Sequence, residues 1–170
     1  VKEVLFLLEK NYINSIKIST VNIKKEDTQT FDFTHQEVAV SEYSKPLTYL
    51  YEPNAAILKS GGFHQISKQL NVYKLHQHSH LYTSEKHIDF PGRIFKIDTI
   101  LPYDKKKLAK LLPEKKANIT TRNFPKTVAQ IRKETKFKEG GNVFIFSTID
   151  INNKPQLVIC KKLNINLSNQ

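Results

Sequence analysis

The sequence contains no Trp and no Met, a single Cys and only five Gly among its 170 residues. The lone cysteine, Cys160, excludes an internal disulfide and favours a reducing, cytoplasmic location. No apolar run approaches the roughly 18 residues of a transmembrane helix, so we expect no membrane partner. The opening VLFLL is also too short for a signal peptide and lacks a cleavage site. A start without Met, inside an apolar stripe, leads us to expect part of a longer protein.

The five glycines form no GxG motif, which is the core of the glycine-rich turn that binds dinucleotide-type cofactors. We therefore expect this fragment to have no catalytic residues and to bind no cofactor. Any enzyme activity would belong to a part of the protein that this chain does not contain.

The net positive charge is confined to the second half of the chain. Residues 1–91 contain ten Lys and no Arg against ten acidic residues, a net charge of zero. Residues 92–170 contain seventeen Lys and Arg against six acidic residues, which accounts for the whole net charge of +11. Such asymmetry favours a polyanionic partner, most simply RNA, over charge that serves solubility alone.

The neutral half alternates between strand-like and helix-like patterns. Alternating apolar residues predict strands over 15–23 and 30–33. A helical stripe predicts a helix over 2–10, and a second helix follows the Asn54 cap and ends at Gly61-Gly62. Two further segments complete this half, a helix over 63–70 and short strands over 72–75 and 81–83. Phe90-Pro91-Gly92 is a turn signal that ends the neutral part.

The basic half predicts the order β-α-β-α-β-β. Its strands are expected over 93–100, 116–121, 142–149 and 156–161. Asp104 is a candidate cap for the first helix, which Pro113 ends, and Pro125 opens the second helix. Two strand-helix-strand crossovers followed by a hairpin indicate a mixed sheet with helices on one face. The fold class is therefore α+β, in two small packed units over residues 1–91 and 92–170.

Basic side chains lie away from the apolar stripes of both predicted helices, so a continuous basic surface is expected. The candidate RNA-binding residues are Lys105, Lys106, Lys107, Lys110, Lys115, Lys116, Arg122, Asn123, Lys126, Arg132 and Lys133. Arg122 and Asn123, just before the second helix, are the best candidates for a specific contact with a phosphate or terminal nucleotide. Simple helix capping by Asn123 is the alternative.

Several segments resemble a known family. GRIFKI (92–97), KLLPEKKANITTRNFP (110–125) and LVICKK (157–162) resemble the THUMP-like C-terminal module of bacterial class I S-adenosylmethionine (SAM)-dependent methyltransferase-like proteins. YLYEPNAAILKSG (49–61) and HLYTS (80–84) resemble the ferredoxin-like segment that precedes this module. The opening VKEVLFLLEK resembles the start of that segment.

The resemblance implies an RNA-binding accessory region, for tRNA or rRNA, of a SAM-dependent methyltransferase. SAM would bind the missing catalytic domain, and the expected partners are structured RNA and the protein's own methyltransferase domain. The alternative is a structural module that packs against the methyltransferase domain without touching RNA.

Three other features of the sequence are candidates for a metal site, a reactive thiol or a functional carboxylate. His76, His78 and His80 would face one side of a strand, which suits a metal, but no nearby residue evidently completes the ligand set. We therefore expect no metal site. Cys160 lies in an apolar strand, where thiols are usually inert. Glu52 in YEPN could be a site residue, although a role at the entry of the next helix explains it more simply.

Overall fold

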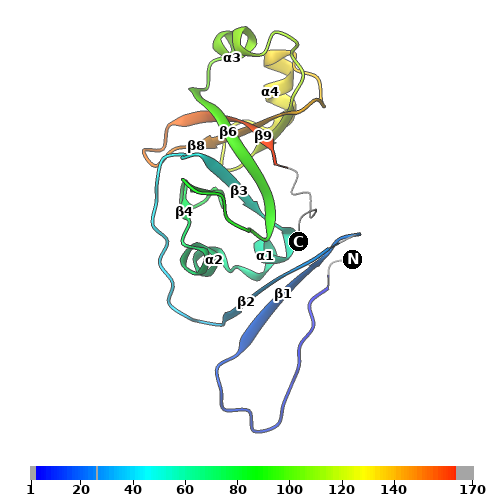
Figure 1. The fold of residues 1–170 in the computed structure, drawn as a ribbon, viewed down its shortest axis with the longest axis vertical. Coiled ribbons are helices and arrows are strands. Elements are labelled where there is room, and N and C mark those ends of the chain that lie inside the picture. Colours follow the sequence, from blue (N-terminus) through cyan, green and yellow to red (C-terminus); the bar gives the residue numbers. More distant parts are fainter. Residues whose placement is uncertain (1–2, 26, 164–170) are drawn as a thin grey trace.

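The computed structural model describes residues 3–25 and 27–163, which form a two-stranded hairpin, a seven-stranded sheet and four helices (Figure 1). The strands are β1 (Lys17–Ile23), β2 (Thr28–Thr34), β3 (Tyr49–Pro53), β4 (Tyr73–Lys74), β5 (Tyr82–Ser84), β6 (Gly92–Pro102), β7 (Asn118–Thr121), β8 (Val143–Ile149) and β9 (Pro155–Lys162). The helices are α1 (Ala55–Ser60), α2 (Phe63–Leu70), α3 (Lys105–Leu111) and α4 (Val128–Thr135). Within the described residues no helix is long and apolar enough to cross a membrane.

The large sheet has the strand order β4-β5-β3-β6-β9-β8-β7 and is mixed, as the sequence predicts. Only β7 and β8 pair in parallel, because α4 provides the crossover between them. The remaining pairs in the sheet are antiparallel. The predicted order β-α-β-α-β-β of the basic half is therefore correct.

The two predicted units share this sheet. β3, from the neutral half, pairs along its whole length with β6, the first strand of the basic half. The long strand β6 crosses the middle of the molecule in Figure 1 and continues into the pairing with β9. The backbone hydrogen bonds of one sheet therefore run from one unit into the other, with a register shift between Ile97 and Thr99 in the β6–β9 pairing.

Strand register divides the apolar residues between the two faces of the sheet. On one face, Tyr51 and Ile94 pack with the hairpin and with α1 and α2, while Ile145 and Ile159 pack beneath α3 and α4. We call this the helix face. Neighbouring positions such as Phe95 point to the opposite face, where they pack with Leu50, Leu75, Leu81, Phe146, Val158 and Cys160. We call this the inner face, and the loop over residues 75–81 covers it.

Local signals located most helices accurately. Asn54 caps α1 by accepting hydrogen bonds from the backbone N–H of Ala56 and Ile57, and α2 occupies the predicted residues 63–70. α4 begins at Val128 rather than at Pro125, because Thr127 and Gln130 form a reciprocal capping box. Leu111, in the last turn of α3, is 44% exposed.

The predicted helix over residues 2–10 is wrong for the residues that the structure describes, and Lys2 lies outside them. Residues 3–9 form neither helix nor strand, and the side chains from Val4 to Leu8 are exposed to solvent. Isolated helices of this length are unstable in water, and no other described element covers the apolar stripe.

The pairing of β3 with β6 leaves no room for a side chain at Gly92. A Cβ atom there would lie 2.1 Å from the carbonyl oxygen of Glu52, which is backbone that cannot rotate away. We expect Gly92→Ala to lower the free energy of unfolding by about 2–3 kcal/mol, as overpacking does. Urea denaturation measures this, with Thr30→Ala on the exposed hairpin face as the control. Equal stability of the two variants would contradict the prediction.

Candidate RNA interface and the polar cluster beside it

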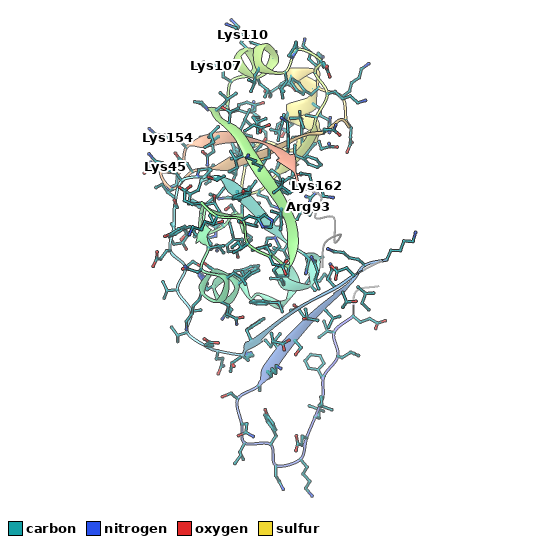
Figure 2. All side chains as sticks on the ribbon, in the orientation of Figure 1. Lys45, Arg93, Lys107, Lys110, Lys154 and Lys162 are labelled. Carbon is teal, nitrogen blue, oxygen red and sulfur yellow. The ribbon has the colours of Figure 1, made fainter. Side chains whose placement is uncertain are left out.

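Helix α3 presents lysines because its capping and its apolar residue fix its orientation. The carboxylate of Asp104 accepts hydrogen bonds from the backbone N–H of Lys106 (2.8 Å) and Lys107 (3.1 Å). Leu108 is fully buried on the opposite side of the helix. Figure 2 shows Lys107 and Lys110 projecting from α3 into solvent, away from the sheet.

Seven of the predicted RNA-binding residues are exposed lysines. They are Lys105, Lys106, Lys107, Lys110, Lys115, Lys116 and Lys133. Among the described residues, none of them forms an ion pair. Their charge is therefore available to a ligand without loss of an internal contact.

Three predicted cations are instead held by internal partners. Arg122 donates to the carboxylate of Glu52 (2.6 Å). The ammonium group of Lys126 lies 2.6 Å and 2.7 Å from the two carboxylate oxygens of Glu134. The guanidinium of Arg132 donates to two backbone carbonyls near the end of α4, those of residues 117 and 137. A phosphate would have to share or replace these contacts.

Arg122 and Asn123 do not join the lysines of α3. Side chains alternate along β7, and Ile119 points to the helix face, so Arg122 points toward the inner face, where it meets Glu52. The single continuous basic surface expected from the sequence is therefore divided. Capping by Asn123 is also wrong, because Thr127 is the N-cap of α4.

Glu52 is the anionic centre of the inner face. Its side chain is 5% exposed and accepts from two arginines, with Arg122 on one carboxylate oxygen and Arg93 on the other. Arg93 also lies over the ring of Phe95, 5.4 Å from its centroid. Glu52 therefore links β3 and β6 to the end of β7, while Asn54 performs the helix-entry role that the sequence assigned to this segment.

A second polar chain runs beside this carboxylate. His76 Nδ1 accepts from the Nδ2 amide of Asn123 (3.0 Å) and from the backbone N–H of His78 (3.2 Å). His76 Nε2 lies 3.0 Å from Oδ1 of Asn153 in the β8–β9 turn. A neutral imidazole with its proton on Nε2 satisfies all three hydrogen bonds. The chain joins the loop of the first unit to two loops of the second.

Two open pockets lie on either side of Asn153. The larger, with a volume of about 520 Å³, is lined by Thr121, Asn123, Phe124, Pro125, Ile149, Asn153 and Pro155. The smaller, of about 320 Å³, is lined by Tyr43, His76, Gln77, Ile151 and Asn153. The larger pocket combines the apolar side chains of Phe124, Ile149 and two prolines with the amides of Asn123 and Asn153, and each amide has one end that is not used by His76.

The histidine run does not form the strand that a shared metal site would need. Residues 77–79 form a turn, so the three histidines point to different surroundings. His76 hydrogen-bonds with the two asparagines and His78 is exposed. The ring of His80 stacks on that of Phe63, with 3.8 Å between the ring centroids. No group of three or more potential ligands from His, Cys, Asp and Glu occurs in the part of the chain that the structure describes.

Burial lowers the basicity of neighbouring side chains beneath this loop. Lys74 is fully buried and donates to the carbonyl of Gln77 (3.0 Å), and desolvation lowers its pKa to about 8. Desolvation also lowers the pKa of His80 to about 4, with further lowering by the charge of Lys74. On the inner face, burial raises the pKa of the Cys160 thiol, which leaves it protonated and inert.

The sequence does not indicate that Glu52, His76 and Asn153 lie near one another. Glu52 stands alone in an apolar strand, and His76 belongs to a run of histidines. Only the fold brings these positions together, since Glu52 and Arg122 are 70 residues apart. The nearest sequence signal was the presence of a carboxylate in an otherwise apolar strand, YLYEP.

Removal of the Glu52 charge should destabilise the fold. In Glu52→Gln, two arginines would lose their shared carboxylate, and we expect the free energy of unfolding to fall by about 2 kcal/mol. The matched control is Glu134→Gln, whose pair with Lys126 is more exposed and should contribute much less to stability. Urea denaturation at pH 7 measures both, and equal losses would show that burial of Glu52 is unimportant.

Acid should destabilise the protein through His80. The unfolded imidazole has a pKa of about 6.5 and the folded one a pKa of about 4, so between these values the unfolded state binds more protons. The stability that this difference contributes is present above pH 6.5 and is lost as the pH falls toward 4. We expect this to amount to about 2 kcal/mol, which is less than the full shift would give because solvent screens a half-buried ring.

The comparison of His80→Asn with His78→Asn tests this effect. Asn tolerates the positive φ of 50° at position 80, and His78 is an exposed neighbour. Unfolding free energies at pH 7 and pH 4.5 should show a smaller acid loss for His80→Asn than for the wild type, whereas His78→Asn should follow the wild type. Parallel losses in all three proteins would exclude His80 as the cause.

Comparisons with known proteins agree with the resemblance seen in the sequence. A family described as a ferredoxin-like domain matches residues 49–91, and a THUMP domain-like family matches residues 92–162. A crystal structure from Porphyromonas gingivalis W83, named a "putative methyltransferase", is similar with a TM-score of 0.80 and 34% sequence identity. That similarity covers 87% of this chain and 38% of the other. A comparison with curated proteins found no match.

The expected resemblance is therefore confirmed for its two domains. Since this chain spans only 38% of the length of the solved structure, an activity of that whole protein cannot be assigned to these residues. Residues 49–162 belong to two domain families in succession, a ferredoxin-like domain and a THUMP-like domain.

Proposed function

We propose that this chain binds RNA through its THUMP-like domain and presents that RNA to a SAM-dependent methyltransferase domain elsewhere in the protein. The family supports the first part, because THUMP domains are RNA-binding modules. The name of the similar solved structure supports the second. In this proposal the chain has no catalytic role, and the protein acts in the cytoplasm.

The observation that carries the proposal is the set of seven exposed lysines without internal ion pairs. Four of them occupy α3, and the others follow it or lie on α4. When unpaired lysines bind phosphates, they release the counterions that are condensed on the RNA backbone. This release supplies most of the affinity for RNA. Phosphate contacts also fix the position of the RNA on the protein.

The larger pocket supports a further contact with one unstacked base. Its apolar walls suit the face of a base, and its two amides suit polar groups on the edge. Arg122, next to Asn123, is half-exposed and still able to approach a phosphate while it remains paired with Glu52. In this arrangement Arg122 and Asn123 act at the pocket, and the lysines of α3 act on the flanking strand.

A second candidate function is a structural module that packs against the methyltransferase domain without contacting RNA. The internal partners of Arg122, Lys126 and Arg132 favour it, because three predicted phosphate ligands already stabilise the fold. The two candidates differ in one measurable property, which is RNA affinity of this chain alone.

RNA binding should depend on salt and on the lysines of α3. We expect filter binding with total tRNA to give an affinity that falls linearly on a log–log plot against salt, with a slope of about 0.7–0.9 per phosphate contact. In Lys107→Ala/Lys110→Ala, loss of two contacts should weaken binding at low salt and reduce the slope by about 1.5.

The control is Lys10→Ala/Lys25→Ala, which removes two exposed lysines from the neutral half. It should leave both affinity and slope unchanged. Equal effects of the two double variants would mean that charge asymmetry has no role, and an absence of binding at low salt would leave the structural module as the function. Neither double variant should unfold the protein, since exposed charges contribute little to stability.

A further inference from the structure

An apolar arm extends from the fold without contacting a core. We define the apolar arm as residues 4–16, which form neither helix nor strand. The five consecutive side chains from Val4 to Leu8 are between 75% and 95% exposed, and Ile13 is 93% exposed. Five large apolar residues in succession, each open to water, are uncommon in a stable surface and indicate an interaction site.

The sequence of the arm has the pattern of a helix that the fold does not form. Val4, Leu5, Leu7 and Leu8 would share one helical face, with charged residues on either side. A segment of this length gains too little from its own hydrogen bonds to be helical in water. An apolar groove that covers the stripe would supply the missing stabilisation, as in the binding of an amphipathic helix by a partner.

The hairpin continues this apolar surface. Val21 and Ile23 of β1 are 53% and 80% exposed, because they alternate with Thr20, which is buried on the inner side of the hairpin. Their cross-strand partners, Thr30 and Thr28, are uncharged. Figure 1 shows the arm and hairpin at the opposite end of the molecule from α3 and α4. A partner bound here would leave the lysines of α3 accessible.

The solved relative indicates what covers this surface. More than half of that chain, 62% of its length, lies outside the part that this chain matches. The relative is named for methyltransferase chemistry, yet the domains of this chain that it matches contain no GxG turn for a cofactor. The methyltransferase domain of that protein therefore lies in the remainder of its chain.

We propose that the apolar arm and the outer face of the β1–β2 hairpin form the docking surface for a methyltransferase domain, and that residues 4–10 become helical when docked. The proposal rests on the proposed function in one respect, the association with a methyltransferase domain. The arm is also electrically neutral, with Lys10 against Glu9, which suits an apolar protein groove better than an anionic membrane.

The test uses the part of the Porphyromonas gingivalis protein outside the match, produced as a separate protein and titrated with this chain. Isothermal titration calorimetry should detect binding, and far-ultraviolet circular dichroism should show more helix than the sum of the two proteins. In Leu5→Glu/Leu8→Glu, which charges the apolar stripe of the arm, affinity should fall at least tenfold. Ile100→Glu, at an exposed apolar position on β6, should bind as the wild type does.

Three results would overturn the proposal: no binding by the wild-type chain, equal weakening by Ile100→Glu, or concentration-dependent self-association through the arm. The last would identify a second copy as the partner. Filter binding of tRNA by the same variants separates this proposal from the proposed function. RNA affinity should be unchanged in Leu5→Glu/Leu8→Glu. If the wild-type chain does not bind tRNA, the proposed RNA recognition is refuted, while the docking proposal is unaffected.

Discussion

Pairing between β3 and β6 joins the ferredoxin-like and THUMP-like domains. The burial of Glu52 in this strand pair determines much of the surrounding structure. A carboxylate with 5% exposure requires charged partners, and Arg93 and Arg122 provide them from β6 and from the end of β7. In the same strand pair, Gly92 approaches the backbone of Glu52 closely. The two domains consequently fold around one sheet rather than as separate bodies.

Burial around the loop over residues 75–81 has electrostatic consequences. Lys74 and His80 lie over the ring of Phe63 of α2, away from water, and their charged forms become less favourable. His76, in contrast, accepts and donates hydrogen bonds within the polar chain to Asn123 and Asn153. Histidines that are neighbours in sequence therefore have different chemical roles.

The two ends of the molecule differ in chemistry. Lysines without partners gather on α3 and around it, whereas exposed apolar side chains occupy the arm and the hairpin. Phosphate binding and domain docking place opposite demands on a surface, because one requires hydrated cations and the other requires apolar area. Their separation allows both proposed contacts to be made at the same time.

Sequence patterns were sufficient wherever structure depends on neighbouring residues. Capping by Asn54 and Asp104, the extent of α2 and the order of strands in the basic half follow from local propensity and alternation. Tertiary structure decided which polar groups meet. Arg122 points toward Glu52 because long-range strand pairing sets the direction of each side chain. The arm is not helical because helix formation there needs a surface that this fold does not supply.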